Sequence, residues 1–111
     1  MDIRTLQNEA WANSEKHGFH ETEKDREPIT KLMLMIEEII ESFQEIRDGN
    51  NLRLITYREE DGKPEGFPVE LADLVIRTCD LAGILQVDLM RAIAEKHAFN
   101  LTRPYKHGRK L

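Results

Sequence analysis

The sequence predicts an all-α protein whose four-helix bundle is completed by homo-oligomerisation. Apolar residues recur at the spacing of one helix face in four separate stretches, and glycine, proline or Asp-Gly motifs separate these stretches. Aromatic residues make up only 6% of the 111 residues and charged residues 33%, so one chain has a limited apolar supply for its core. A chain of this length also buries a modest share of its surface. We therefore predict one domain, residues 1–111, with a dimer as the minimum assembly.

The first predicted helix covers residues 2–17. Apolar side chains recur along it at helical spacing, at Ile3, Leu6 and Ala10. Gly18 favours the left-handed conformation that commonly ends a helix. The polar segment that follows, up to Pro28, is predicted to be irregular.

The second predicted helix starts at Pro28, because the missing N–H of proline costs nothing in the first turn. Asp48-Gly49-Asn50 ends it. One apolar stripe runs along this helix and is predicted to be core. Its members are Ile29, Leu32, Met33, Ile36, Ile39, Ile40, Phe43 and Ile46.

The rest of the chain contains a long connection and two more predicted helices. Residues 51–67 are rich in turn-forming motifs, and a connection of this length in a compact domain is often functional. A third helix is predicted from about Val69 to Leu85, and it is apolar enough to be buried on most sides. A fourth runs from its N-cap Asp88 to about Asn100. A basic tail, about residues 101–111, follows it.

The charge distribution excludes some functions. The net charge is -5, with 11 basic and 21 acidic side chains in residues 1–95 and five basic and no acidic ones in residues 96–111. This net negative charge argues against binding of polymeric nucleic acid. The single Cys79 fits a reducing cytoplasm, and no run approaches the ~20 apolar residues of a membrane span. We expect a cytoplasmic protein without a membrane partner.

Acidic side chains carry the strongest chemical signal. Glu38 and Glu41 are three residues apart on the second helix, and Glu70 and Asp73 repeat that spacing on the third. An ordinary solvated face would explain the first pair alone. The second pair lies on a largely apolar helix, where Arg77 offers an intrahelical partner for Asp73. One arginine does not neutralise four converging acids.

A divalent cation would resolve that repulsion. Two unit charges ~4 Å apart interact by ~4 kcal/mol at an effective dielectric near 20, so the packed helices need positive charge between them. Carboxylate oxygens without accompanying cysteine or paired histidine suit Mg²⁺, or Mn²⁺ as a substitute, better than zinc. A di-iron bundle would require Glu-x-x-His on two helices, and no glutamate here has a histidine three residues later.

At these residues the sequence resembles the MazG-like all-alpha nucleotide pyrophosphohydrolases. The resemblance consists of Glu37-Glu38-Ile39-Ile40-Glu41, then Glu70-Leu71-Ala72-Asp73, then Lys96, Asn100, Arg103 and His107-Gly108, over about residues 29–108. It implies a MazG-like bundle that forms dimers or tetramers, in which sites may include residues of a neighbouring subunit. It further implies that Glu38, Glu41, Glu70 and Asp73 coordinate magnesium.

The implied reaction is hydrolysis of a (deoxy)nucleoside triphosphate at the α-phosphate, which yields a monophosphate and pyrophosphate. Glu37 or Glu41 is then a candidate to orient or deprotonate the attacking water, beside Glu38 as a catalytic residue. The basic tail suits a triphosphate, and its candidate contacts are Lys96, Asn100, Arg103, Lys106 and His107. The resemblance places base recognition in the N-terminal region, where the candidates are Trp11, His17, Phe19 and His20.

Two alternatives remain open from sequence. A phosphoribosyl-ATP or dUTP-type pyrophosphohydrolase of the same fold would use similar acids. Substrate preference would distinguish it from the (deoxy)nucleoside triphosphate pyrophosphohydrolase described above. A non-catalytic helical module that dimerises would carry its acids for solubility, and it predicts no response to magnesium.

Overall fold

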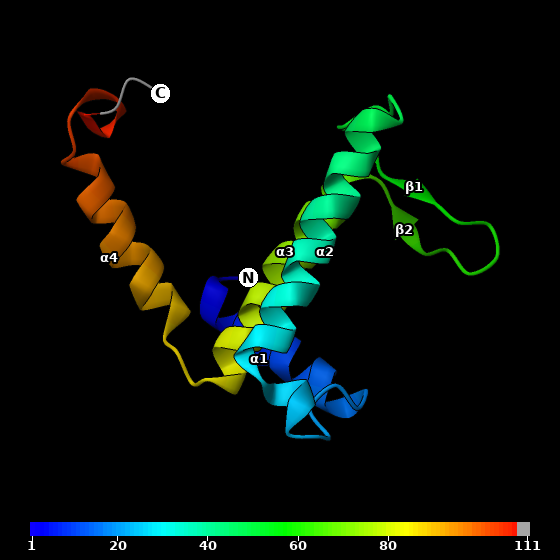
Figure 1. The fold of residues 1–111 in the computed structure, drawn as a ribbon, viewed down its shortest axis with the longest axis horizontal. Coiled ribbons are helices and arrows are strands. Elements are labelled where there is room, and N and C mark those ends of the chain that lie inside the picture. The colour runs from blue at the N-terminus through cyan, green and yellow to red at the C-terminus, as the bar shows by residue number, and fades with distance from the viewer. Residues whose placement is uncertain (109–111) are drawn as a thin grey trace.

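The computed structural model describes residues 1–108 of the chain, and it confirms an all-α fold (Figure 1). The main elements are α1 (Ile3–Lys16), α2 (Pro28–Arg47), α3 (Phe67–Ile84) and α4 (Leu89–Leu101). Short elements connect or follow them: η1 (Lys24–Arg26), β1 (Thr56–Tyr57), β2 (Pro64–Glu65) and η2 (Tyr105–Gly108). No helix within residues 1–108 has both the length and the apolar character required to cross a bilayer.

Helix α1 begins and ends at the residues that the sequence indicates. The Asp2 side chain caps its N-terminus by accepting a hydrogen bond from the Thr5 backbone N–H at 2.8 Å. At the other end Gly18 adopts a positive φ of 84°, and the Phe19 N–H donates to the Ser14 carbonyl. This closing bond turns the chain sharply away from α1.

Helix α2 starts with Pro28, as predicted, and Gly49 at φ 71° follows its end. Residues 51–66 then form a two-stranded antiparallel hairpin in which Thr56 pairs with Glu65. The hairpin extends from the end of α2 at which α3 begins (Figure 1). Gly66 returns the chain to α3, and a Cβ at this position would lie 2.5 Å from the Leu54 carbonyl oxygen, so only glycine fits.

Helix α3 is the central element, because both α1 and α2 pack along it (Figure 1). It starts two residues before the predicted Val69, since Pro68 is accommodated in its first turn. Helix α4 has the predicted N-cap Asp88, whose side chain accepts from the Arg91 N–H at 3.1 Å. Beyond its first turns α4 extends away from the other helices (Figure 1).

The prediction that the apolar stripe of α2 is core is wrong for the single chain. Its eight members are 44–64% exposed, whereas the buried residues of α2 are Lys31, Glu38 and Ser42. Helix α3 packs on the polar face of α2, and α4 does not pack against the stripe because it extends away from α2 (Figure 1).

Helix α3 is likewise less buried than its composition predicts. Leu71, Val75, Ile76 and Leu85 are all exposed, and the buried residues of α3 are Cys79, Asp80 and Ala82. The apolar residues of α2 and α3 therefore form a large uncovered surface, rather than the interior of one subunit.

Candidate metal centre

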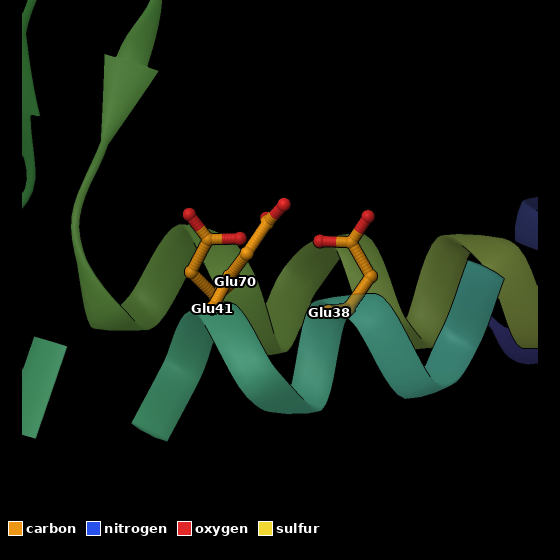
Figure 2. A group of neighbouring side chains, drawn as sticks. All are labelled: Glu38, Glu41 and Glu70. Carbon is orange, nitrogen blue, oxygen red and sulfur yellow. The ribbon is translucent and has the colours of Figure 1, made fainter. Parts of the chain in front are cut away.

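Helices α2 and α3 bring three glutamates together (Figure 2). Glu38 and Glu41 come from successive turns of α2, and Glu70 comes from the first turn of α3. One carboxylate oxygen from each residue lies within 4.8 Å of the other two. The carboxylates in Figure 2 stand on the same side of the helix pair. Two stretches of chain 28 residues apart thus contribute to one cluster, which we call the acidic cluster (Glu38, Glu41 and Glu70).

The three members of the acidic cluster differ in burial. Glu38 is 5% exposed, Glu70 is half-buried and Glu41 is exposed. The cluster therefore has a dry inner end at Glu38 and a wet outer end at Glu41. This gradient gives small polar ligands access from one side while it lowers the local dielectric on the other.

Two oxygens of the acidic cluster lack a hydrogen-bond partner. Within the described residues, Glu38 Oε2 and Glu70 Oε2 are buried side-chain oxygens with no donor in reach. A buried acceptor left in this way costs roughly 1–3 kcal/mol, and more when it is charged. Carboxylate oxygens are the ligands that hard divalent cations prefer, so a cation among these residues would satisfy both. The chemistry of the acidic cluster therefore fits a divalent cation.

The pKa values of acids in and beside the cluster also favour a bound cation. Burial, and then the neighbouring Glu41 and Glu38 carboxyl groups, raise the pKa of Glu70 to about 8. Burial and the negative charge of Glu38 also raise the pKa of Asp73. Without a cation, the folded protein must therefore hold a proton here near neutral pH, which a divalent cation would displace.

Arg77 contributes the positive charge that reaches the cluster from α3. Its Nε donates to Glu38 Oε1 at 2.7 Å, so the expected intrahelical pair with Asp73 is replaced by a pair between α3 and α2. The bond forms because α2 packs beside α3, which brings the buried Glu38 of α2 within reach of Arg77. It satisfies one oxygen of Glu38 and leaves the other without a donor.

The other predicted acids lie near the cluster but outside it. Asp73 is half-buried one turn beyond Glu70, and it is not among the three residues whose oxygens converge within 4.8 Å. Glu37 is exposed and is also outside that group. The geometry therefore groups three of the four predicted metal ligands, with Glu41 inside the group and Glu37 outside it.

The predicted phosphate contacts are not near the acidic cluster in the single chain. Lys96 and Asn100 lie on the second half of α4, and Arg103 and Lys106 follow it, at the end that points away from α2 and α3 (Figure 1). Lys96 Nζ and the Arg103 guanidinium lie 5.2 and 5.8 Å from the centre of the Phe99 ring. The side chain of His107 lies outside the described part of the chain.

Asn100 shares one property with the acidic cluster. Its Oδ1 is buried without a hydrogen-bond partner among the described residues. Phe99 beside it is 57% exposed. This part of α4 thus presents cations, an amide and an aromatic ring that make few contacts with their own subunit.

The four predicted base-binding residues are separated by the fold. Trp11 lines an open groove of about 530 Å³ beside Gly83 and Asp88. His17 caps its own helix, with Nδ1 2.8 Å from the Asn13 carbonyl oxygen. His20 is only 5% exposed and its ring nitrogens contact two carboxylates, so it is not free to bind a base.

Phe19 is the one of the four that lines a cavity beside the acidic cluster. This α1–α3 cavity measures about 310 Å³. Asp73 and Arg77 form its edge toward the cluster. The residues that line the rest of it are Ala10, Asn13, Ser14, Phe19, Lys31, Ile76 and Asp80.

A buried polar network underlies this cavity. Asp80 Oδ1 accepts from His20 Nε2 at 2.8 Å, and Asp80 Oδ2 accepts from the Ser14 hydroxyl at 2.9 Å. Lys31 Nζ is 4.0 Å from the same Oδ2. The sequence prediction missed Asp80, although a signal was present: Asp73, Arg77 and Asp80 fall at i, i+4 and i+7, on one face of an otherwise apolar helix.

Comparison of the chain with protein-family models, with curated proteins and with solved structures finds no match. Inferences about function therefore rest on the residues and the geometry of this chain.

Proposed function

We propose that this protein is a magnesium-dependent nucleoside triphosphate pyrophosphohydrolase. It converts a (deoxy)nucleoside triphosphate to a monophosphate and pyrophosphate by attack of water at the α-phosphate. One observation carries the proposal: three carboxylates from two helices converge around buried oxygens that have no donor. Such an arrangement is costly for folding alone, because like charges approach in a partly dry site.

Glu38, Glu41 and Glu70 would hold Mg²⁺, with Mn²⁺ as a possible substitute, and Asp73 would complete the set after a small shift. Mg²⁺, when bound, neutralises phosphate oxygens and lowers the pKa of a nearby water. Arg77 orients the Glu38 carboxylate by its 2.7 Å bond. Glu41 is exposed at the open end of the cluster, so it orients the attacking water and accepts its proton.

A triphosphate also requires donors that the acidic cluster does not supply. Lys96, Asn100, Arg103, Lys106 and His107 have the required chemistry, and the direction of α4 takes them away from the cluster of their own subunit (Figure 1). We propose that they act on the cluster of a second copy. The active protein would then be a homodimer, or a tetramer built from dimers, with each site composed of two subunits.

The uncovered apolar stripe of α2 supports this assembly. Eight large apolar residues on one helix face, each 44–64% exposed, are far more than a soluble monomer normally leaves in water. A second copy could cover them by a self-complementary contact and so complete a four-helix core. The stripe is on the face of α2 opposite Glu38, which leaves the acidic cluster open.

Two alternatives make different use of the same features. A non-catalytic dimerisation module accounts for the stripe, but not for buried carboxylate oxygens that lack donors. A phosphoribosyl-ATP or dUTP-type enzyme differs in substrate, and a substrate panel separates it from the proposed activity.

The test is a panel of canonical and modified nucleoside triphosphates with Mg²⁺, in which monophosphate and pyrophosphate are both measured. We expect equal amounts of the two products, and a loss of at least about 100-fold in kcat/KM for Glu38→Gln. Glu45→Gln is the matched control, since Glu45 lies on the same helix outside the acidic cluster and its carboxylate accepts a hydrogen bond from Asn50. Orthophosphate as the first product, or full activity of Glu38→Gln, would refute the proposal.

A further inference from the structure

The α1–α3 cavity contains a buried cation that the proposed chemistry does not use. Lys31, on the second turn of α2, is 6% exposed. Its Nζ donates to the Phe19 carbonyl oxygen at 3.1 Å and lies 4.0 Å from Asp80 Oδ2. An ammonium group has three N–H donors. The Phe19 carbonyl oxygen accepts from one of them, whereas Asp80 Oδ2 at 4.0 Å is an ion-pair partner beyond hydrogen-bond distance. The Lys31 ammonium therefore has donors available to a ligand in the cavity.

The carboxylate of Asp80 is already engaged. Both of its oxygens accept hydrogen bonds, from His20 and from Ser14. The other ring nitrogen of His20 faces Glu15 at 2.6 Å, which fixes the imidazole in place. The carboxylate of Asp80 therefore holds the network together. Beside that network the group left for a ligand is the Lys31 ammonium, whereas the carboxylate of Asp73 lies at the edge toward the acidic cluster.

Two further features define the shape of a suitable ligand. The Phe19 ring and the Ile76 side chain supply apolar walls, and Asn13 adds a side-chain amide at the exposed edge. A volume of about 310 Å³ is at the lower end for small-molecule sites, enough for one flat ring system with a sugar. The cavity reaches the acidic cluster through Arg77, which bonds Glu38. A ligand there would lie beside the proposed triphosphate site.

We propose that the α1–α3 cavity binds the nucleobase, and that Lys31 selects bases with a carbonyl oxygen where adenine and cytosine carry an amino group. This inference rests on the proposed function. Uracil, thymine, guanine and hypoxanthine present an acceptor at that position, whereas adenine and cytosine present a donor. An amino group set against the Lys31 ammonium would leave two buried donors facing each other, and such unpaired groups are strongly disfavoured.

The inference is tested with nucleosides alone, in EDTA, so that neither phosphate nor metal contributes. Inosine and adenosine form one matched pair and uridine and cytidine another, because each pair differs chiefly at the position in question. Saturation-transfer NMR and titration of backbone amide shifts measure the affinities. We expect the carbonyl member of each pair to bind at least about tenfold more tightly, the effect of one hydrogen bond to a charged donor.

Lys31→Met should abolish this preference, because it keeps the length of the side chain and removes the donor. Lys24→Met is the control, since Lys24 is exposed on η1, which precedes α2. Lys31 is buried, so a thermal melt first establishes that the variant folds. Asn13→Ala provides a second variant at an exposed helical position, and it should weaken binding of all four nucleosides by several-fold.

Equal affinity of the wild-type protein for both members of each pair, or no binding of any, would overturn the inference. Amide shifts confined to residues away from the cavity would do the same. These outcomes differ from failure of the proposed function. Pyrophosphate release without base preference removes only the assignment of the cavity, and nucleoside preference without hydrolysis removes only the enzymatic proposal.

Discussion

Arg77 Nε donates to Glu38 Oε1 at 2.7 Å across the interface between α2 and α3, while Glu38 Oε2 beside it has no donor among the described residues. The bond orients the carboxyl group of Glu38, a residue that is only 5% exposed. The free oxygen is then available to a cation. Because one oxygen of Glu38 is bonded to Arg77 and the other is not bonded, changes at either residue should have measurable effects.

Arg77→Met should destabilise the protein and make its stability more dependent on magnesium. Glu38 would lose the one side-chain donor that it has among residues 1–108. Loss of a hydrogen bond between charged groups costs roughly 1–3 kcal/mol, and the cost is at the lower end here because Arg77 is partly exposed. Urea unfolding with and without Mg²⁺ measures the change. Arg47→Met, at the last turn of α2, is the control. If the two variants lost equal stability, the pair would have no special role.

The stability of the metal-free protein should fall as the pH rises from about 4.5 to about 8. Unfolded Glu70 loses its proton near 4.5, but folded Glu70 keeps it until about 8. The contribution of Glu70 to stability is therefore greatest below its pKa in the unfolded chain, and it is lost as the pH rises through its pKa in the folded protein. The raised pKa of Asp73 acts in the same direction.

Thermal melts in EDTA at about pH 5, 7 and 9 test this dependence. Glu70→Gln should make the melting temperature less dependent on pH, because the glutamine side chain does not ionise. Addition of Mg²⁺ should raise the wild-type melting temperature most at the alkaline end, where no proton competes. A profile that rises with pH in EDTA would contradict the prediction.

The apolar stripe of α2 should decide the assembly state. Ile40→Lys places a charge at its centre, at a position that is 58% exposed in one chain, so the folded subunit tolerates it while a dimer interface would not. Light scattering after gel filtration should show the wild type as a dimer or tetramer and Ile40→Lys as a monomer. Ile55→Lys, on an exposed apolar residue outside the stripe, should leave the mass unchanged. A monomeric wild type would refute the assembly.

Two inactive variants should restore each other if sites are shared between subunits. Glu38→Gln removes a ligand from the acidic cluster, and Lys96→Met removes a cation from α4. In mixed dimers one site would combine an intact cluster with an intact partner α4. Random exchange would return about a quarter of the wild-type sites. If α4 served its own cluster, the mixture would stay inactive.

Gly83→Ala should destabilise the contact between α1 and α3. A Cβ at Gly83 would lie 2.9 Å from two Trp11 side-chain atoms, so the indole must move. Alanine normally stabilises a helix by about 0.5–1 kcal/mol relative to glycine, and overpacking costs roughly 1–3 kcal/mol. We expect a net loss in urea unfolding. A gain in stability would mean that Trp11 moves freely.

Much of the fold was predictable from sequence. The bounds of α1, α2 and α4 follow from local signals, because Asp2, Pro28 and Asp88 act within one helical turn of where they stand. The repeated three-residue spacing of acids on α2 and α3 also predicts that each pair shares a face. These properties depend on neighbours in the chain, and the sequence contains them.

The partners of buried side chains were not predictable in this way. The sequence indicated that the stripe of α2 would be core, whereas the packing of α3 on α2 buries Glu38 and leaves the stripe exposed. It also suggested Asp73 as the partner of Arg77, and gave no indication that Lys31 approaches Asp80, 49 residues away along the chain.

The sequence by itself therefore determined the helices, their ends and the chemical character of each face. Only the tertiary structure decided which face of α2 meets α3, and with it the acidic cluster, the α1–α3 cavity and the uncovered stripe. The physical reason is that helix formation depends on short-range capping and spacing, whereas burial depends on which helices are available to cover a face. In this chain the direction of α4 leaves the apolar face of α2 uncovered (Figure 1).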